Sequence, residues 1–284
     1  MRFINNREAR IDLNMEVPFF TFPALSALSF IKHGFSTRLG GVSKGQFSTM
    51  NLNRKVMDAY DDPANVNENF RRIAKSIGFD VNSVVLSKQV HKTNIRLVDE
   101  SDRGKGLIIP RDYDEIDGLI TNNANVTLVT KYADCVPLYF ADPVKKAIGL
   151  SHSGWRGTVG MIGKITVEEM GKAFGSDPKD IIAVIGPSIC RDCYEIAGST
   201  VDEFMKAFPE GIDSILTPKD NGRYLCDLWE ANRLVLLKAG LQASNIHISG
   251  VCTSCNDDIL FSHRKTQGKR GSLAAFLTII DEAN

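Results

Sequence analysis

Three residues of this sequence could bind a metal ion together, although they lie in separate segments. His91 follows the run "SVVLSKQV", Cys135 stands in "YADCVPLYF", and His152 ends "KAIGLSH". The apolar, β-branched residues around each of them are typical of β-strands. We therefore expect three strands of one sheet to bring the three side chains to a common rim.

Two imidazoles and one thiolate can hold zinc with a fourth coordination position open, which is the usual form of a catalytic zinc site. A water molecule bound to such an ion ionises near pH ~7. No short metal-binding motif such as H-E-x-x-H accompanies these residues. Taken alone, they also fit strand-end histidines bonded to the backbone beside a buried, inert cysteine.

The segment "GWRGTVG" after His152 could bind an anion. Here the chain passes from a strand through glycines into a helix that we expect to begin near Thr158. The N–H groups at a helix N-terminus attract anions, and the guanidinium of Arg156 at its mouth suits phosphate. The alternative is an arginine in a surface ion pair.

Two C-x-x-C pairs are present, Cys190 with Cys193 and Cys252 with Cys255. They could form a structural zinc site, a redox pair or simple loop thiols, and the pairs are much farther apart than in a zinc ribbon. Cys226 is expected to be a small buried apolar residue.

Composition limits the classes of partner. The 284 residues include 34 Lys and Arg and 34 Asp and Glu, so the net charge is zero. This balance gives no indication of nucleic-acid or membrane binding, and no apolar run is long enough for a transmembrane helix. The N-terminal segment lacks the apolar stretch of a signal peptide. We expect a cytoplasmic protein whose cysteines are thiols or metal ligands.

The pattern of elements predicts an α/β (α+β) chain with mixed sheets, in a single domain over residues 1–284 because no linker divides it. The acidic run "RDYDEID" is expected to be a solvated loop. The expected helices are 61–78, 158–175 and 227–240, and the first has an Asp cap, Pro63 in its first turn and Gly78 as its stop. The expected strands are 83–90, 94–99, 126–132, 136–142, 146–152, 181–186, 246–250 and 273–280.

The sequence resembles the bacterial YfiH/YlmD-type family, also called laccase-domain or polyphenol oxidoreductase proteins. The resemblance extends from about residue 33 to 280, and its specificity comes from the order of many motifs. These are "HGFSTRLGGVSKG", "QVH", "DGLIT", "ADCVPLYFADP", "HSGWRGT", "IGPSICRDCYEI", "DLWEANRLVL" and "CTSCNDDILFSHRK". One departure is "KYADC", where the family pattern leads us to expect "RTADC".

The resemblance implies a layered α/β sandwich and a zinc-dependent purine nucleoside phosphorylase whose zinc ligands are His91, Cys135 and His152. Its small-molecule partners would be phosphate and a purine nucleoside: adenosine, inosine or methylthioadenosine. The products would be the free base and the sugar 1-phosphate. No oligomeric state is implied.

Further roles are predicted around this centre. Asp134 is a candidate for moving the proton to the base, and Tyr194 for stacking on the purine. The predicted phosphate and substrate ligands are Arg38, Arg156, His263 and Arg264.

Several other functions stay open. Some family members deaminate adenosine, and the same zinc site could do so here. Copper in place of zinc would give weak polyphenol oxidase activity, although too few histidines remain for a multicopper centre. Without metal, Cys135 and His152 could act as the nucleophile and base of a hydrolase. A non-enzymatic scaffold is the last alternative.

Overall fold

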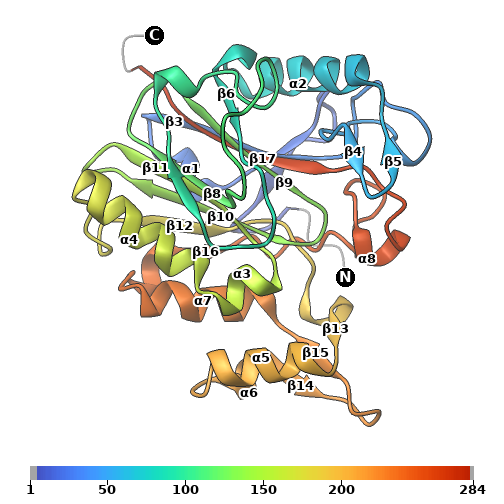
Figure 1. Ribbon diagram of the computed structural model, residues 1–284, viewed down its shortest axis with the longest axis vertical. Helices are drawn as coiled ribbons and strands as arrows, with labels where there is room; N and C mark the ends of the chain where they lie inside the picture. The colour runs from blue at the N-terminus through green and yellow to red at the C-terminus, as the bar shows by residue number, and fades with distance from the viewer. Residues whose placement is uncertain (1–4, 282–284) are drawn as a thin grey trace.

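Two mixed β-sheets packed face to face form the centre of the computed structural model, which describes residues 5–281 (Figure 1). Residues 1–4 and 282–284 of the predicted 1–284 domain lie outside the described residues, and the first four of them belong to the N-terminal segment considered above. The predicted fold class is confirmed, because both sheets mix parallel and antiparallel pairs and helices flank them. Among the described residues, no helix has the length and apolarity needed to cross a bilayer.

The first sheet is antiparallel except for β6, which pairs parallel with β9. In spatial order its strands are β1 (Arg10–Ile11), β2 (Phe19–Thr21), β3 (Ile31–Ser36), β17 (Leu273–Ile279), β9 (Thr127–Tyr132) and β6 (Val84–Leu86).

The second sheet is antiparallel in its middle, with a parallel pair at each edge. In spatial order its strands are β16 (Ile246–Ile248), β12 (Ile182–Ile185), β10 (Val136–Asp142), β11 (Ala147–Ser153), β8 (Gly118–Thr121) and β7 (Ile95–Leu97). Two smaller sheets are β13 (Glu195–Ile196) with β15 (Tyr224–Cys226) and β14 (Leu216–Pro218), and β4 (Lys55–Val56) with β5 (Ala59–Tyr60).

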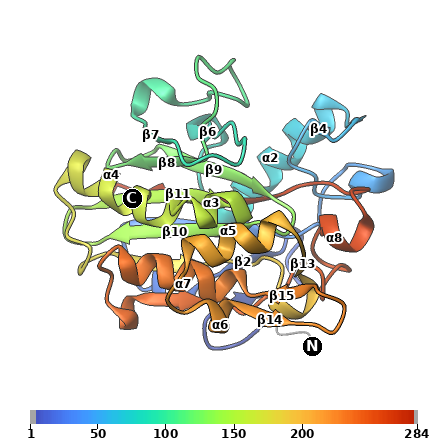
Figure 2. The ribbon, with the colours of Figure 1, turned by 60° about the horizontal axis from the view of Figure 1, so that its bottom comes forward.

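Helices cover the outer faces of both sheets. Helix α2 packs Phe70 and Ile73 toward Phe276 of the first sheet, and α4 and α7 cover the second (Figures 1 and 2). The α-helices are α1 (Pro23–Ser26), α2 (Pro63–Ile77), α3 (Trp155–Val159), α4 (Ile162–Phe174), α5 (Ser199–Ala207), α6 (Ile212–Ile215), α7 (Leu228–Lys238) and α8 (His263–Thr266). The 3-10 turns are η1 (Gly45–Phe47), η2 (Val81–Ser83), η3 (Glu100–Asp102), η4 (Arg191–Cys193) and η5 (Ala243–Asn245).

The predicted helix over 61–78 is confirmed with its end signals. The Asp62 side chain accepts a hydrogen bond from the backbone N–H of Ala64 at 2.8 Å, and Gly78 ends the helix with φ 90°. The left-handed conformation at Gly78 is one that glycine adopts without steric cost. Local sequence signals were sufficient here because both ends are fixed by neighbours in the chain.

The prediction of one helix over 158–175, beginning near Thr158, is wrong. Helix α3 begins at Trp155 with Gly154 as its N-cap, and α4 begins separately at Ile162. Met161 between them has φ 61°, a left-handed conformation that breaks an α-helix. The chain turns at Met161, where the apolar pattern alone suggested continuity.

The hydrogen bond of Tyr139 links the two sheets and should contribute to stability. The buried Tyr139 hydroxyl on β10 donates to the carbonyl of Gly34 on β3 at 2.9 Å. We expect Tyr139→Phe to lower the free energy of unfolding by about 1–3 kcal/mol, because it leaves a buried carbonyl without its partner. Urea denaturation measures this, with the exposed Tyr60→Phe as the control. Equal stability of the two variants would contradict the prediction.

Candidate metal centre

The three predicted ligands meet at the junction of the two sheets. His91 lies in the loop after β6 of the first sheet, and His152 lies on β11 of the second. Cys135 lies in the turn that carries the chain from β9 to β10, and thus from one sheet to the other. The expectation of three strands in one sheet is wrong, because Asp134 (φ 89°) redirects the chain between the sheets.

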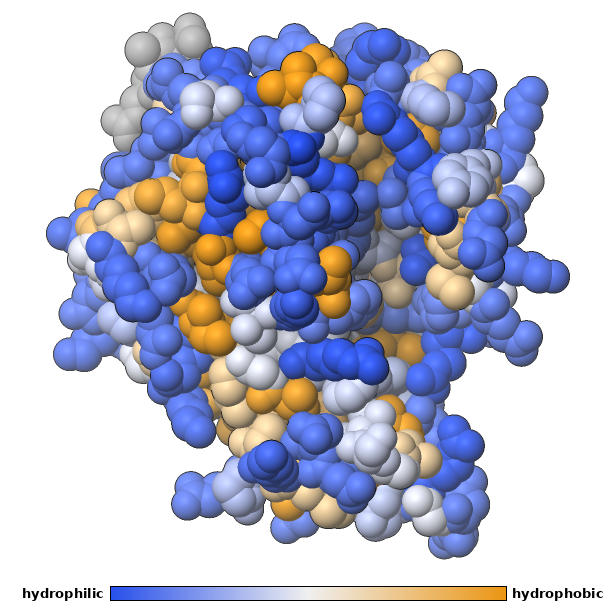
Figure 3. Space-filling model, in the orientation of Figure 1, coloured by the Kyte–Doolittle hydropathy of each residue, from blue (hydrophilic) through white to orange (hydrophobic). Residues whose placement is uncertain are grey.

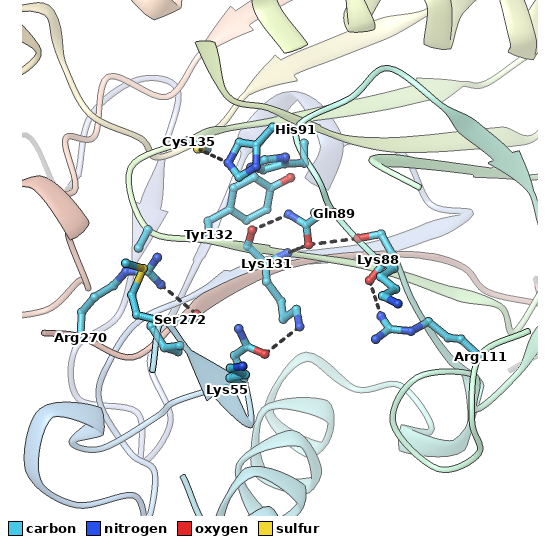
Figure 4. Close-up of a pocket in the computed structure, with 16 residues that line it drawn as sticks. Lys55, Lys88, Gln89, His91, Arg111, Lys131, Tyr132, Cys135, Arg270 and Ser272 are labelled. Carbon is cyan, nitrogen blue, oxygen red and sulfur yellow. Dashed lines mark hydrogen bonds between the residues drawn. The ribbon is translucent and has the colours of Figure 1, made fainter. Parts of the chain in front are cut away.

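The potential ligand atoms of His91, Cys135 and His152 all lie within 4.8 Å of one another. The Nε2 atom of His91 is 4.0 Å from the Sγ atom of Cys135, and the two imidazole rings meet edge to face with centroids 4.8 Å apart. Figure 4 shows the His91 ring directed at Cys135 above the cavity. Residues distant in the sequence therefore form one compact donor set.

The carboxylate of Asp117 holds two of these ligands in place. It accepts hydrogen bonds of 3.0 Å from the backbone N–H groups of Val90, His91 and Lys92. It also binds Nδ1 of His152 at 2.9 Å, which leaves Nε2 of His152 for a metal ion. Asp117 is fully buried. The expectation that "RDYDEID" is a solvated loop is therefore wrong at its last residue, Asp117. The sequence assigned Asp117 no role beyond its place in the "DGLIT" motif.

Gln89 fixes the same loop from its other side. Its side-chain amide donates to the Lys131 carbonyl at 2.7 Å and accepts from the Lys131 N–H at 2.9 Å. The side chain thus extends the pairing of β6 with β9 beyond the end of β6. His91 itself has φ 63°, an uncommon conformation for a non-glycine residue, and these hydrogen bonds hold the loop that contains it.

The electrostatics of the centre favour a thiolate. Burial raises the pKa of the Cys135 thiol, but the imidazoles of His152 and His91 outweigh burial and lower the pKa to about 6. Burial lowers the pKa of His152, whereas Cys135 and Asp117 outweigh it and raise the pKa to about 9. Burial also raises the pKa of Asp117, but hydrogen bonds from His152 and the backbone hold the pKa below its usual value. At neutral pH the metal-free centre is therefore an ion pair.

Gly154 provides the room that a bound ion would need. A Cβ atom at this residue would lie 2.9 Å from Cδ2 of His91 and 3.2 Å from Sγ of Cys135. A side chain there would therefore crowd the donor atoms. Two imidazoles and a thiolate fit zinc with an open fourth position, and they also fit copper.

The donor set lies at the wall of a cavity of about 240 Å³. In the space-filling view the surface is hollowed beside the β4–β5 hairpin, with mainly hydrophilic residues around the hollow (Figure 3). The lining contains no Asp or Glu, and its Lys and Arg residues are Lys55, Lys88, Arg111, Lys131 and Arg270. The cavity is thus suited to an anion.

Two of these cations have features that sequence analysis missed. Lys131 donates to Oδ1 of Asn53 at 2.8 Å, and burial, with Arg111 and Arg54 nearby, lowers its pKa to about 8. The Nε atom of Arg270 is buried and has no hydrogen-bond partner among residues 5–281. Lys131 and Tyr132, which form the departure "KYADC", both line the cavity. The departure "KYADC" was therefore the sequence signal that could have indicated Lys131.

The three arginines predicted to bind phosphate do not line this cavity. Arg38 donates to the backbone carbonyls of Ser48 and Asp257. Arg156 is exposed, with its guanidinium 4.3 Å from the centroid of the Trp155 ring. Their roles, and that of Arg264, stay predictions.

The remaining predicted residues surround the turn that contains Cys135. Asp134 accepts hydrogen bonds of 2.6 Å from the Thr253 hydroxyl and from the backbone N–H of Arg264. The Arg264 guanidinium lies 5.0 Å from the centroid of the Tyr194 ring, and His263 begins α8. No contact of these side chains with a substrate is established.

The other histidines do not form a second cluster. Nε2 of His33 accepts from the backbone N–H of Phe22 at 2.8 Å, and burial lowers its pKa to about 4. His247 pairs with Glu8 through Nδ1 at 2.9 Å. Within the described part of the chain, the centre at the sheet junction is the one cluster of potential metal ligands that contains histidine.

Comparison with known proteins identifies similar chains of nearly the same length. Residues 32–280 match the family model described as multi-copper polyphenol oxidoreductase laccase. The purine nucleoside phosphorylase YlmD of Bacillus subtilis is 40% identical over 248 residues, covering 86% of this chain and 87% of that protein. The crystal structure of YlmD from Geobacillus stearothermophilus superposes with a TM-score of 0.88 at 34% identity, over 97% of this chain and 100% of the other. A protein named adenosine deaminase from an unknown prokaryotic organism is 34% identical over 85% of this chain and 93% of its own length.

Loss of the Asp117 charge should weaken metal binding. We expect Asp117→Asn to lower zinc affinity about 10–100-fold, because His152 and the loop of His91 lose the group that orients them. Competition with a chromophoric chelator measures the affinity. The matched control is Asp114→Asn, since Asp114 is exposed and pairs with Lys88. Unchanged affinity in Asp117→Asn would show that Asp117 does not position the ligands.

Proposed function

The chain belongs to the multi-copper polyphenol oxidoreductase laccase family, as its motifs predicted, and on that premise we propose that it is a purine nucleoside phosphorylase. Relatives in this family are named as enzymes that act on purine nucleosides. The proposed reaction converts a purine nucleoside and phosphate into the free purine and ribose 1-phosphate. The proposed substrates are adenosine and inosine, with methylthioadenosine as a further candidate.

One observation carries the proposal: the His91, Cys135 and His152 donor set lies in the wall of a cavity lined by cations and free of Asp and Glu. Hydrolysis or deamination requires only water as the second reactant, whereas phosphorolysis requires a site for a dianion. Arg111, Lys131 and Arg270 line this cavity, and we propose them as the cations that bind the dianion (Figure 4).

The reaction defines what these residues must do. A phosphate oxygen forms a bond to C1′ of the ribose while the bond from C1′ to the purine nitrogen breaks, and the departing purine takes up a proton. Arginine and lysine donors hold the phosphate oxygens in line with C1′. Lys131 contributes its charge at neutral pH and loses it as the pH rises through its pKa of about 8.

His91, Cys135 and His152 would hold the zinc ion, with Asp117 orienting His152. Bound there, zinc would supply a Lewis acid that polarises an oxygen ligand. The proton role proposed for Asp134 requires one of its two hydrogen bonds, from Thr253 or Arg264, to open. Stacking of a purine on Tyr194 would compete with Arg264, whose guanidinium lies 5.0 Å from the centroid of that ring.

Two further functions are supported by specific observations. The similarity to a protein named adenosine deaminase supports deamination at the same centre. The thiolate of Cys135 beside His152, with Asp117 on the far nitrogen of His152, also resembles the nucleophile, base and orienting acid of a cysteine hydrolase. By contrast, His33 and His247 have partners of their own, and this separation argues against a multicopper oxidase centre.

Removal of the thiolate ligand should abolish phosphorolysis. We expect Cys135→Ala to lose zinc and to release adenine from adenosine more than about 100-fold more slowly, because Lewis-acid stabilisation worth several kcal/mol is lost. Zinc is measured by mass spectrometry, and products are measured by chromatography with and without phosphate. The control is Cys226→Ala, which removes a fully buried thiol that belongs neither to this donor set nor to a C-x-x-C pair.

The other outcomes of this assay identify the competing functions. Inosine formed from adenosine without phosphate would replace phosphorolysis with deamination. Hydrolytic activity that survives removal of metal but disappears in Cys135→Ala would support the cysteine hydrolase. In either case the product forms without phosphate, and that result would contradict the phosphorylase proposal.

The cations of the cavity should determine the affinity for phosphate. We expect Arg270→Gln to raise the KM for phosphate about 10–100-fold while the KM for adenosine changes little, since a charge-assisted hydrogen bond contributes about 1.5–3 kcal/mol. Steady-state kinetics with each substrate varied measure both constants.

Arg156→Gln is the matched comparison, because Arg156 is exposed and does not line the cavity. A rise in the KM for phosphate in Arg156→Gln alone would return phosphate to the site at α3 that the sequence suggested. It would also contradict the assignment of the cavity.

A further inference from the structure

The four cysteines of the two C-x-x-C pairs converge at a second site, apart from the centre described above. The sulfur atoms of Cys190, Cys193, Cys252 and Cys255 all lie within 4.8 Å of one another. In the first pair Cys190 is the N-cap of η4 and Cys193 is its last residue, and the second pair lies in the loop between β16 and α8. A parallel bridge of Ser188 with Cys252 joins the two segments, so the long separation in sequence is closed by the fold.

The spacing of the sulfurs matches a metal ion with four thiolate ligands. Zinc bound to four sulfurs at about 2.3 Å in a tetrahedron separates the sulfurs by about 3.8 Å. The Sγ atoms of Cys193 and Cys255, one from each pair, lie 3.5 Å apart, and all four residues are free thiols. The side chains are therefore gathered around a common point.

Backbone donors are directed at these sulfurs. Sγ of Cys252 accepts from the N–H of Cys255 at 3.4 Å and from the N–H of Cys190 at 3.3 Å. The N–H of Cys193 donates to the carbonyl of Cys190 at 3.1 Å, which closes the turn of the first pair. Donors to sulfur stabilise thiolates, the form in which cysteine binds metals. One donor to the Cys252 sulfur comes from each pair, so the backbone of both turns is directed at the same group of sulfurs.

From this geometry we propose that Cys190, Cys193, Cys252 and Cys255 bind a structural zinc ion, a second metal site of the chain. The four protein ligands leave no coordination position open, so this site is closed to substrate. A dication at their centre would offset part of the repulsion among four thiolates so close together. The ion would hold together two loops that have little regular secondary structure of their own.

The two loops of this site contact Asp134, the residue before Cys135. Thr253, between the second pair of cysteines, donates to Oδ1 of Asp134, and the N–H of Ile189 donates to the Asp134 carbonyl at 3.0 Å. Both zinc-bound loops thus hold the left-handed residue that precedes Cys135. The zinc site fastens the loops that shape one side of the first metal centre.

The test is the metal content and zinc coordination of the full chain and its variants. We expect about two zinc ions per chain in the wild type and about one in His91→Ala, with a shell of sulfur only at about 2.3 Å by zinc X-ray absorption in that variant. Cys193→Ser should also retain about one ion, now with nitrogen among its neighbours. Cys226→Ala, the matched control, should retain both ions.

His91→Ala keeps the test decisive if Cys193→Ser fails to fold, because His91 is exposed and all four cysteines remain. Loss of all zinc from folded His91→Ala would overturn the proposal. Mass spectrometry showing a Cys193–Cys255 disulfide in place of bound metal would overturn it too. Neither result depends on nucleoside turnover, so the second site is tested independently of the proposed function.

Discussion

A buried carboxylate, that of Asp117, is the constraint on which the metal centre depends. An ionised carboxylate away from water is costly unless hydrogen bonds compensate it, and Asp117 obtains three from the backbone of residues 90–92 and one from His152. These partners belong to the loop that follows β6 of the first sheet and to β11 of the second sheet. Satisfying one charge therefore fixes how the two halves of the donor set face each other.

The face-to-face sheets explain why the site lies where it does. The turn over Ala133, Asp134 and Cys135 is a direct passage from one sheet to the other, and the loops that surround it come from both sheets. The cavity opens next to this passage, where strand ends leave backbone and side chains that the core does not cover. The cationic side chains that line it come from β4, from β9, from the loop after β6 and from the segments before β8 and β17.

Local sequence patterns predicted what local interactions decide. The strands over 136–142 and 146–152 and the capped helix α2 were confirmed because alternation, apolar runs and end signals lie within a few residues of one another. Residue type was enough to select His91, Cys135 and His152 as candidate ligands, and the structure brings them together. Their predicted sheet assignment was wrong, because the passage between sheets leaves no local pattern. Asp117, Gln89 and Arg270 were missed for the same reason: their partners are Lys131, His152 and the cavity, all remote in sequence.

The lowered pKa of Cys135 has a chemical cost that concerns oxidation. With a pKa of about 6, the sulfur is already a thiolate at neutral pH before any metal arrives, and thiolates rather than thiols react with peroxides. Cys135 also borders a cavity open to solvent. An ion bound to the sulfur would occupy its reactive electron pair, so loading with metal would protect the residue. The stripped protein would be the vulnerable form, able to regain its ion only until the sulfur passes the reversible sulfenic stage.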